Sequence, residues 1–163
     1  MSIALSGTRY DFSNDTKAAI SAFLISNRSH APFLVGDCRS GVDRYVRFFC
    51  DCIRVKYHTY LTEDPRTPAS LRNRTIAMIS AATVLYSFPL NERFSRSGSW
   101  LSIFAAFSGG KKCFVYLPFC KYADLPTCRG ITGWAQVNFS QLNISDHNSF
   151  FWFPTGSQTK LEV

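Results

Sequence analysis

Gly36-Asp37-Cys38-Arg39-Ser40-Gly41-Val42-Asp43 joins a short apolar run, Ala31 to Val35, to a segment with helical periodicity. The apolar positions of that segment recur at i, i+3, i+4, i+7 and i+11, which predicts an amphipathic helix. They are Val42, Tyr45, Val46, Phe49 and Ile53. A glycine-bracketed turn from strand to helix exposes backbone N–H groups where a phosphate or another anion is favoured. Such glycines also occur in turns that bind nothing, so this turn alone leaves both interpretations open.

The rest of the chain repeats this alternation of strand and helix. Strands are predicted at 3–6, 32–35, 54–61, 83–88 and 112–117, and helices at about 15–27, after Gly41, from 68 to about 80, and at 100–107. Thr67 and Pro68 predict the start of the third helix, and Gly109-Gly110 predict the end of the fourth. The pattern favours an α/β fold, with a Rossmann-like, mainly parallel sheet of about five strands flanked by helices.

Beyond Pro118 the pattern changes. The aromatic runs 134–139 and 150–153 predict a hairpin or one or two added edge strands, and the polar tail 156–163 is expected to fray. The chain shows no internal repeat or low-complexity linker. We therefore expect a single domain over 1–163, with a core at about 3–117 and a C-terminal extension at 118–163.

The composition predicts a folded protein with an anionic partner. Hydrophobic residues make up 46% of the 163 residues, which is enough for a substantial core, and the formal net charge is +7. Arginine outnumbers lysine, and guanidinium groups match phosphate and carboxylate geometry. The basic residues form no run of five or more, which favours a pocket over a track along duplex nucleic acid.

The cysteines and the apolar runs indicate the compartment. The N-terminus lacks the pattern of a secretory signal, so the six cysteines predict free thiols in a cytoplasmic protein. Cys50 and Cys52 point in different directions from one helix, and we predict no metal site there. No apolar run is long enough to span a bilayer, so no membrane partner is expected.

Three loops carry residues suited to an anion. In an open parallel sheet ligands bind at the carboxyl ends of the strands, so the loops after the strands are expected to act together. In the first loop Gly7 permits close backbone approach, Thr8 offers a hydroxyl and Arg9 a guanidinium group. The turn from Gly36 to Asp43 is the second, and 93–99 is the third, where serines can cap a helix and donate to phosphate oxygens.

Each of these residues also has a purely structural explanation. Thr8 and Arg9 would then begin a surface turn, and Ser97 or Ser99 would be a plain helix cap. Asp43 favours a helix N-terminus because negative charge is stabilising there; as a functional residue it would accept hydrogen bonds from a ribose or orient the turn. Arg74 lies on a flank of its helix that faces either the sheet edge or solvent.

Residue types for standard catalysis are sparse. His30, His58 and His147 are isolated, without the neighbours that a metal site or a catalytic triad requires. No catalytic residue is identified; Asp43 and Glu92 are the candidates, Asp37 is a further free acid, and no metal ligands are predicted.

The order and spacing of four segments resemble the SLOG superfamily. In that superfamily a Rossmann-like domain links the DNA-processing protein A core, the Lonely-guy phosphoribohydrolases and small nucleotide-ligand sensors. The segments are Leu5-Ser6-Gly7-Thr8-Arg9, the turn 36–43, Asn73-Arg74 before 81–88, and Gly98-Ser99 ahead of Gly110-Lys111. The resemblance covers about residues 3–117 and is nearest to the small YspA/YpsA-related branch.

The resemblance implies a nucleotide or nucleotide-derived phosphorylated ligand, bound without a required cofactor at the carboxyl edge of the sheet. Together with the loop analysis it gives these ligand-binding candidates: Gly7, Thr8, Arg9, Gly36, Asp37, Ser40, Gly41, Asp43, Arg74, Ser97, Gly98 and Ser99. The Lonely-guy signature Pro-Gly-Gly-x-Gly-Thr-x-x-Glu has no acidic counterpart in 95–103, which argues against hydrolysis of an N-glycosidic bond.

Three functions therefore remain in competition. The leading hypothesis is a module that binds or senses a nucleotide-like anion, as a homodimer, in signalling or defence. The first alternative is an enzyme that cleaves or transfers at the N-glycosidic bond of a nucleotide. The second is single-stranded nucleic-acid binding, motivated by the positive charge and by the aromatic residues Phe150, Phe151, Trp152 and Phe153, which this hypothesis expects to be exposed.

Overall fold

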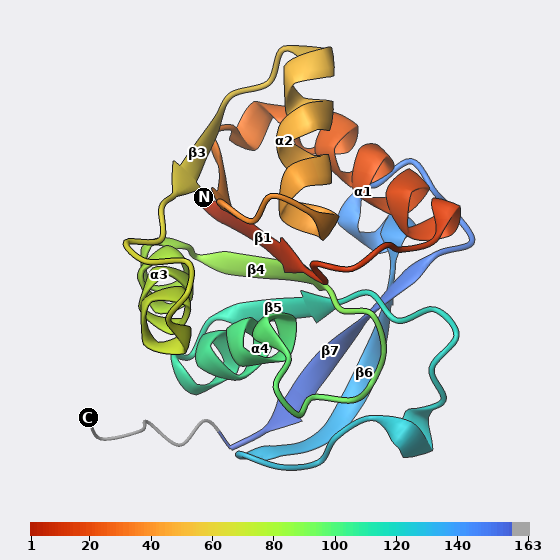
Figure 1. Ribbon diagram of the computed structural model, residues 1–163. Helices are drawn as coiled ribbons and strands as arrows, with labels where there is room; N and C mark the ends of the chain where they lie inside the picture. The colour runs from red at the N-terminus through yellow and green to blue at the C-terminus, as the bar shows by residue number, and fades with distance from the viewer. Residues whose placement is uncertain (158–163) are drawn as a thin grey trace.

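A computed structural model describes residues 1–157, so most of the tail predicted to fray lies outside the described residues. Seven strands form one sheet in the order β3-β2-β1-β4-β5-β7-β6. The strands are β1 (Ile3–Gly7), β2 (Phe33–Gly36), β3 (Tyr57–Tyr60), β4 (Val84–Phe88), β5 (Lys112–Val115), β6 (Ile131–Asn138) and β7 (Phe150–Gly156). The α-helices are α1 (Asn14–Ser26), α2 (Gly41–Ile53), α3 (Pro68–Ala81) and α4 (Gly98–Ser108) (Figure 1).

The first five strands are parallel, which confirms the predicted Rossmann-like fold. From β1 the chain adds β2 and then β3 on one side, and it returns to add β4 and β5 on the other. The strand order therefore reverses between β1 and β4, where the register pairs Gly7 with Phe88. The carboxyl ends of adjoining strands at such a reversal are the usual ligand-binding region of an open α/β sheet.

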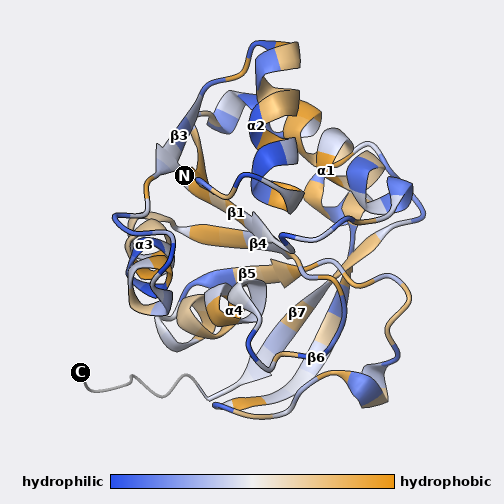
Figure 2. Cartoon of the chain, viewed as in Figure 1, coloured by the Kyte–Doolittle hydropathy of each residue, from blue (hydrophilic) through white to orange (hydrophobic). Residues whose placement is uncertain are grey.

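Two hydrophobic layers hold the helices against the sheet. Helices α1 and α2 cover one face and α3 and α4 cover the other, with the strands between them in Figure 1. Side chains alternate between the layers, so Ile3 and Leu5 of β1 join the first and Ala4 joins the second. Strand β4 is buried along its whole length and is mostly hydrophobic in Figure 2, as expected for a central parallel strand.

Local chemistry sets the helix boundaries. Thr67 is the N-cap of α3 with Pro68 in its first turn, and Gly109 is the C-cap of α4, both as predicted. Helix α4 begins earlier than predicted because Ser97 caps it by accepting a hydrogen bond from the Trp100 N–H. Strand β3 is shorter than the predicted 54–61, because Arg54 adopts the left-handed conformation that ends α2.

The C-terminal segment forms the predicted hairpin but in an unexpected order. Strand β7 lies between β5 and β6, antiparallel to both, so the earlier strand β6 is at the edge. The expectation that the aromatic residues of β7 are exposed is wrong for Phe151 and Trp152, which are 0% and 4% exposed. Phe151 stacks on Phe139, and the Trp152 indole donates to the Leu117 carbonyl. These rings therefore form core and cannot stack on a nucleic acid.

The described residues include no helix long and apolar enough to cross a bilayer. All six cysteines are free, with Cys50 and Cys113 buried and Cys52 exposed. Burial raises the pKa of the Cys50 thiol to about 11, which keeps that thiol neutral near neutral pH.

Candidate functional site

The turn 36–43 is fixed by side chains from outside it. Arg47, one helical turn further along α2, donates to the Gly36 carbonyl and to the Cys38 carbonyl, the latter at 2.7 Å. The Asp37 carboxylate accepts the Thr62 backbone N–H at 2.7 Å and the Thr62 hydroxyl at 2.8 Å. The turn is thus tied both to its own helix and to the loop after β3.

Arg74 of α3 completes this network from the opposite face of the sheet. Its Nη1 lies 3.3 Å from the Asp37 carboxylate and 3.2 Å from the Asp43 carboxylate; the Asp43 side chain is 10% exposed and that of Asp37 is 25% exposed. Nη1 lies so close over Gly36 that a Cβ there would collide with it. Arg74 Nε is buried and has no hydrogen-bond partner within residues 1–157, so one donor of the guanidinium group is unused. The two carboxylates compensate its charge.

The pKa values of the two carboxyl groups are shifted in opposite directions. Burial raises the pKa of Asp43 and outweighs both the Arg74 charge and the hydrogen bonds from Arg74 and the Cys38 N–H. Burial also acts on Asp37, but the hydrogen bonds from Thr62 and the charge of Arg74 together hold its pKa below the usual value. Asp37 is therefore the more firmly ionised partner of Arg74.

The loop after β1 packs directly on the start of α2. The Thr8 N–H donates to the Phe88 carbonyl at 3.0 Å, and the Thr8 carbonyl accepts the Val42 N–H at 2.8 Å. Gly41 has a φ of +67°, and a Cβ there would collide with the Thr8 and Arg9 backbone. A Cβ on Gly7 would in turn meet Val42 and the Phe88 carbonyl. These glycines allow three chain segments to meet at the reversal of strand order.

Polar side chains of the two loops mostly satisfy one another. The Thr8 hydroxyl accepts the Tyr10 N–H at 3.1 Å, and the Ser40 hydroxyl donates to the Arg9 carbonyl at 2.7 Å. The Arg9 guanidinium group is exposed and lies over the Tyr10 ring, 5.7 Å from its centre. Of this loop pair, Arg9 is the residue whose charge is presented to solvent.

The third predicted loop makes hydrogen bonds within the start of α4. Ser97 caps the helix, and its hydroxyl lies 2.9 Å from that of the buried Ser99. Gly98 is exposed, with open space where a Cβ would stand. These contacts agree with the structural explanation for the serines, and they leave the Gly98 backbone accessible.

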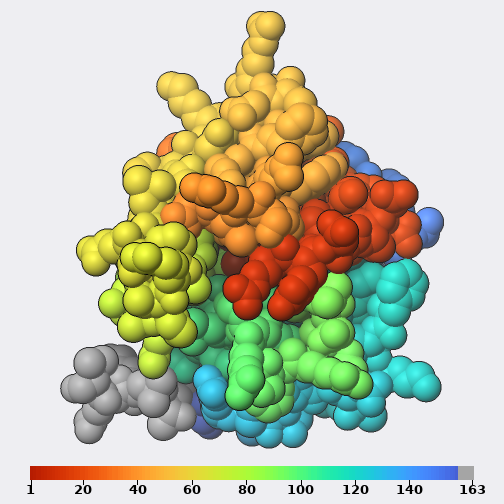
Figure 3. All heavy atoms as spheres, viewed as in Figure 1, coloured from red at the N-terminus to blue at the C-terminus, as the bar shows by residue number. Residues whose placement is uncertain are grey.

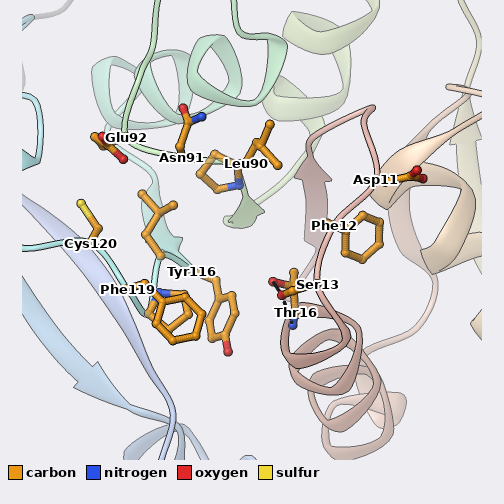
Figure 4. A pocket seen from close by; sticks show the side chains of 13 residues that line it. Asp11, Phe12, Ser13, Thr16, Leu90, Asn91, Glu92, Tyr116, Phe119 and Cys120 are labelled. Carbon is orange, nitrogen blue, oxygen red and sulfur yellow. Dashed lines mark hydrogen bonds between the residues drawn. The ribbon is translucent and has the colours of Figure 1, made fainter.

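Two adjoining cavities lie at the carboxyl edge, on the side of α1 and α2. The larger, about 470 Å³, lies between the loop before α1 and the loops after β4 and β5; we call it the aromatic cavity. Its walls are Asp11, Phe12, Ser13, Thr16, Pro89, Leu90, Asn91, Glu92, Tyr116, Leu117, Pro118, Phe119 and Cys120. Figure 4 shows Glu92 and Cys120 at one end and Asp11 at the other. Its lining includes no lysine or arginine.

The smaller cavity, about 310 Å³, has the opposite character; we call it the basic cavity. It is lined by Asp11, Phe12, Lys17, Gly41, Arg44, Tyr45 and Phe48. Asp11 and Phe12 belong to both cavities, so the two adjoin across them. In Figure 3 the red segment around residues 10–17 accordingly lies between the orange residues of α2 and the green and teal loops after β4 and β5.

Only two of the predicted site residues line these cavities, Gly41 the basic one and Glu92 the aromatic one. The structure brings Gly36, Asp37, Asp43 and Arg74 together, but as a network of mutual contacts. The sequence reasoning missed Phe12, Lys17 and Arg44, which lie outside the predicted glycine-containing loops. The signal for Arg44 was its place in the first turn of α2, three residues after Gly41. Among residues 1–157 no group of three or more His, Cys, Asp or Glu side chains could hold a metal ion.

Comparison with known proteins supports the fold alone. No protein-family model and no curated protein sequence matches the chain. Among solved structures, DNA processing protein A (DprA) from Streptococcus pneumoniae is similar, with a TM-score of 0.58 and 12% sequence identity. The match covers 70% of this chain and 49% of that chain, so it spans about half the length of DprA. The chain therefore has a Rossmann-like fold similar to that of a DprA domain.

Proposed function

We propose that the carboxyl edge of the sheet binds a nucleotide or a nucleotide-derived phosphorylated ligand, with its phosphate in the basic cavity. The observation that carries the proposal is the pairing of Lys17 and Arg44 around a cavity at the start of α2. Neither has an ion pair within the described part of the chain. Two cations that are not compensated by carboxylate partners favour an anion of matching size, and together they outweigh Asp11.

The neighbouring turn supports this assignment through its rigidity. The Asp37, Asp43 and Arg74 network fixes the turn that carries Gly41, and Gly41 lets the Thr8–Arg9 backbone approach α2. A binding site that is ordered before the ligand arrives loses less entropy on binding. We accordingly assign Asp43 and Arg74 to the support of the site. Arg9, whose backbone lies against Gly41, adds a further exposed cation at this edge of the sheet.

The fold is in accord with such a role. The site lies where the strand order reverses, and the similar solved structure is described as a DNA processing protein. We propose membership of the SLOG superfamily on the segments named above, which include Gly7, the turn 36–43 and Gly98-Ser99. The branch to which the chain belongs is part of the same proposal.

Calorimetric titration with AMP, ADP, ADP-ribose and adenosine tests the phosphate site. We expect saturable binding of the phosphorylated compounds and weaker binding of adenosine. Arg44→Ala should weaken AMP binding by about ten- to a hundredfold, because a charge-assisted contact contributes about 1.5 to 3 kcal/mol. Lys112→Ala, which removes an exposed charge at the amino end of β5, should leave the affinity unchanged. The absence of binding by every phosphorylated nucleotide, with the protein shown to be folded, contradicts the proposal.

Single-stranded nucleic-acid binding is the second candidate function. The surface that would bind carries Tyr10 and Phe48, in place of the aromatic run 150–153. Tyr10 and Phe48 are 61% and 60% exposed, and they lie beside Arg9 and Arg44 respectively. Exposed rings next to cations suit stacked bases and phosphates. Fluorescence anisotropy with a labelled oligonucleotide should then show affinity that falls steeply with salt. Salt-independent or absent binding excludes this candidate.

A further inference from the structure

We infer that the aromatic cavity holds an amino-bearing nucleobase, with Glu92 as acceptor for the amino group. The inference rests on the proposed function, because the phosphate of the same ligand would lie across Phe12 in the basic cavity. The aromatic cavity would thus bind the uncharged base, whereas the basic cavity would bind the charged phosphate.

The walls of the aromatic cavity suit a flat ring. Its volume of about 470 Å³ lies within the range of small-molecule sites. In Figure 4 Tyr116 and Phe119 stand on one side, and Phe12, Ser13 and Thr16 stand on the other. Aromatic side chains stack favourably on the face of a nucleobase, and this contribution is about 1 to 3 kcal/mol per base. Phe119 is 81% exposed, so it is free to contact a ligand.

The charges of the two cavities set the orientation of the ligand. Glu92 lies at the end of the aromatic cavity away from Asp11, and Asp11 and Phe12 form the border with the basic cavity. A phosphate next to Glu92 is repelled, whereas an exocyclic amino group can donate to its carboxylate. The same phosphate is attracted by Lys17 and Arg44 in the basic cavity, beyond Asp11 and Phe12. A nucleoside phosphate has this polarity, with amino donor and phosphate at opposite ends.

The border between the cavities also supplies hydroxyl groups. Ser13 is the N-cap of α1 and Thr16 lies in its first turn, and their hydroxyls are 3.0 Å apart. They line the aromatic cavity on the Phe12 side. Phe12 itself is held by edge-to-face contact with Tyr45 and by Lys17, whose ammonium group lies 5.5 Å from the ring centre. The Phe12 side of the aromatic cavity thus places two hydroxyl groups next to an ordered ring, and we assign the sugar of the ligand to this side.

Cys120 shares the Glu92 end of the cavity but does not alter this assignment. Burial, with the nearby charges of Glu92 and Asp124, raises the pKa of the Cys120 thiol to about 11. The thiol is thus neutral near neutral pH and is a poor nucleophile. Glu92 is left as the ionisable acceptor at this end.

Matched ligand pairs test the base and the phosphate separately. Titrations use AMP against IMP, which replaces the amino group by a carbonyl, and AMP against adenosine, which lacks the phosphate. We expect AMP to bind about tenfold tighter than IMP, because IMP places a carbonyl oxygen, an acceptor, against the Glu92 carboxylate where AMP places an amino donor. Glu92→Gln should reduce this preference to less than about twofold while keeping the preference for AMP over adenosine. Glu63→Gln, an exposed glutamate that lines neither cavity, is the matched control.

Phe119→Ala provides a second test that does not depend on Glu92. The variant should bind both AMP and adenosine about tenfold more weakly than the parent protein, because the stacking ring is lost and the phosphate site is intact. If AMP and IMP bind equally, or if both variants bind AMP as the parent protein does, the inference is overturned and the proposed function stands. If adenosine binds as tightly as AMP, and inosine binds more weakly than adenosine, the phosphate site fails and the base site stands. If no nucleoside or nucleotide binds, both fail.

Discussion

The turn 36–43 and the two cavities beside Phe12 lie at the same edge of the sheet but use charge in opposite ways. In the turn, Asp37 and Asp43 are paired with a buried arginine, and glycines bring chain segments into contact. Around the cavities, Lys17 and Arg44 have no carboxylate partner in the described structure, and Phe48 and Phe119 are mostly exposed. Paired charges hold a fold together, whereas unpaired charges are available to a ligand.

This difference shows that a glycine motif can mark close packing within the protein and need not mark direct contact with a ligand. Gly36 and Gly41 are needed because other atoms occupy the space of their missing side chains, and those atoms belong to the protein itself. The motif therefore marks the place in the fold where loops converge, and the ligand contacts that we propose come from residues next to it. The predictions that follow test this division between support and contact.

Removing Arg74 should cause the largest loss of stability. Arg74→Met leaves Asp37 and Asp43 without their partner, and breaking a largely buried ion pair costs about 3 to 5 kcal/mol. Chemical denaturation measures the effect. The control is Arg66→Met, whose pair with Asp64 is exposed, and no measurable loss is expected there. A loss of stability in Arg74→Met no larger than in the control would refute the supporting role of the network.

Gly41→Ala should have the next largest effect, about 3 kcal/mol. An alanine there adopts a left-handed conformation and its Cβ meets the backbone of Thr8 and Arg9, which cannot rotate away. Gly98→Ala is the matched control, because it adds the same methyl group in open space at the start of a helix. That change should be neutral or slightly stabilising, by about 0.5 kcal/mol. Equal melting temperatures for the two variants would show that Gly41 is not a point of close contact.

How far these features could be predicted from the sequence depends on their range. The five parallel strands and four helices follow from local periodicity, and the cap at Thr67-Pro68 was predicted. The order of β6 and β7 was not, because antiparallel pairing is decided by contacts distant in sequence. The burial of Phe151 and Trp152 depends on that order, and alternation within one short run cannot show whether one or both faces of a strand are covered.

In the candidate site, too, the features that depend on contacts distant in sequence could not be predicted. The three predicted loops follow strands, so their place at the carboxyl edge is a consequence of the fold. The partners of Arg74 were not predictable, because Asp37 and Asp43 lie more than thirty positions away and face it across the sheet. The same holds for the aromatic cavity, whose walls combine residues 11–13, 16, 89–92 and 116–120. No local pattern marks such a combination.

Asp37→Asn should make the stability of the turn less dependent on pH. The pKa of Asp37 is lower in the folded protein than its ordinary value of 3.8, so its contribution is present above that value and is lost as the pH falls through the folded pKa. We expect the variant to be less stable by about 2 kcal/mol near neutral pH, since hydrogen bonds to a charged acceptor are lost. The two proteins should converge in acid. Denaturation midpoints across the acid range measure this, and a constant difference contradicts it.

The smallest effect on stability is expected for the cavity cations. Lys17→Gln and Arg44→Gln break no ion pair of the described residues, and only the contact of Lys17 with the Phe12 ring is lost. A contact of that kind between half-buried side chains contributes about 0.5 to 1 kcal/mol, so the double variant should unfold within about 1 kcal/mol of the parent protein. Urea denaturation without ligand is the measurement. A larger loss would mean that these cations stabilise the fold as Arg74 does; a small loss together with weaker AMP binding would show that their charge serves the ligand.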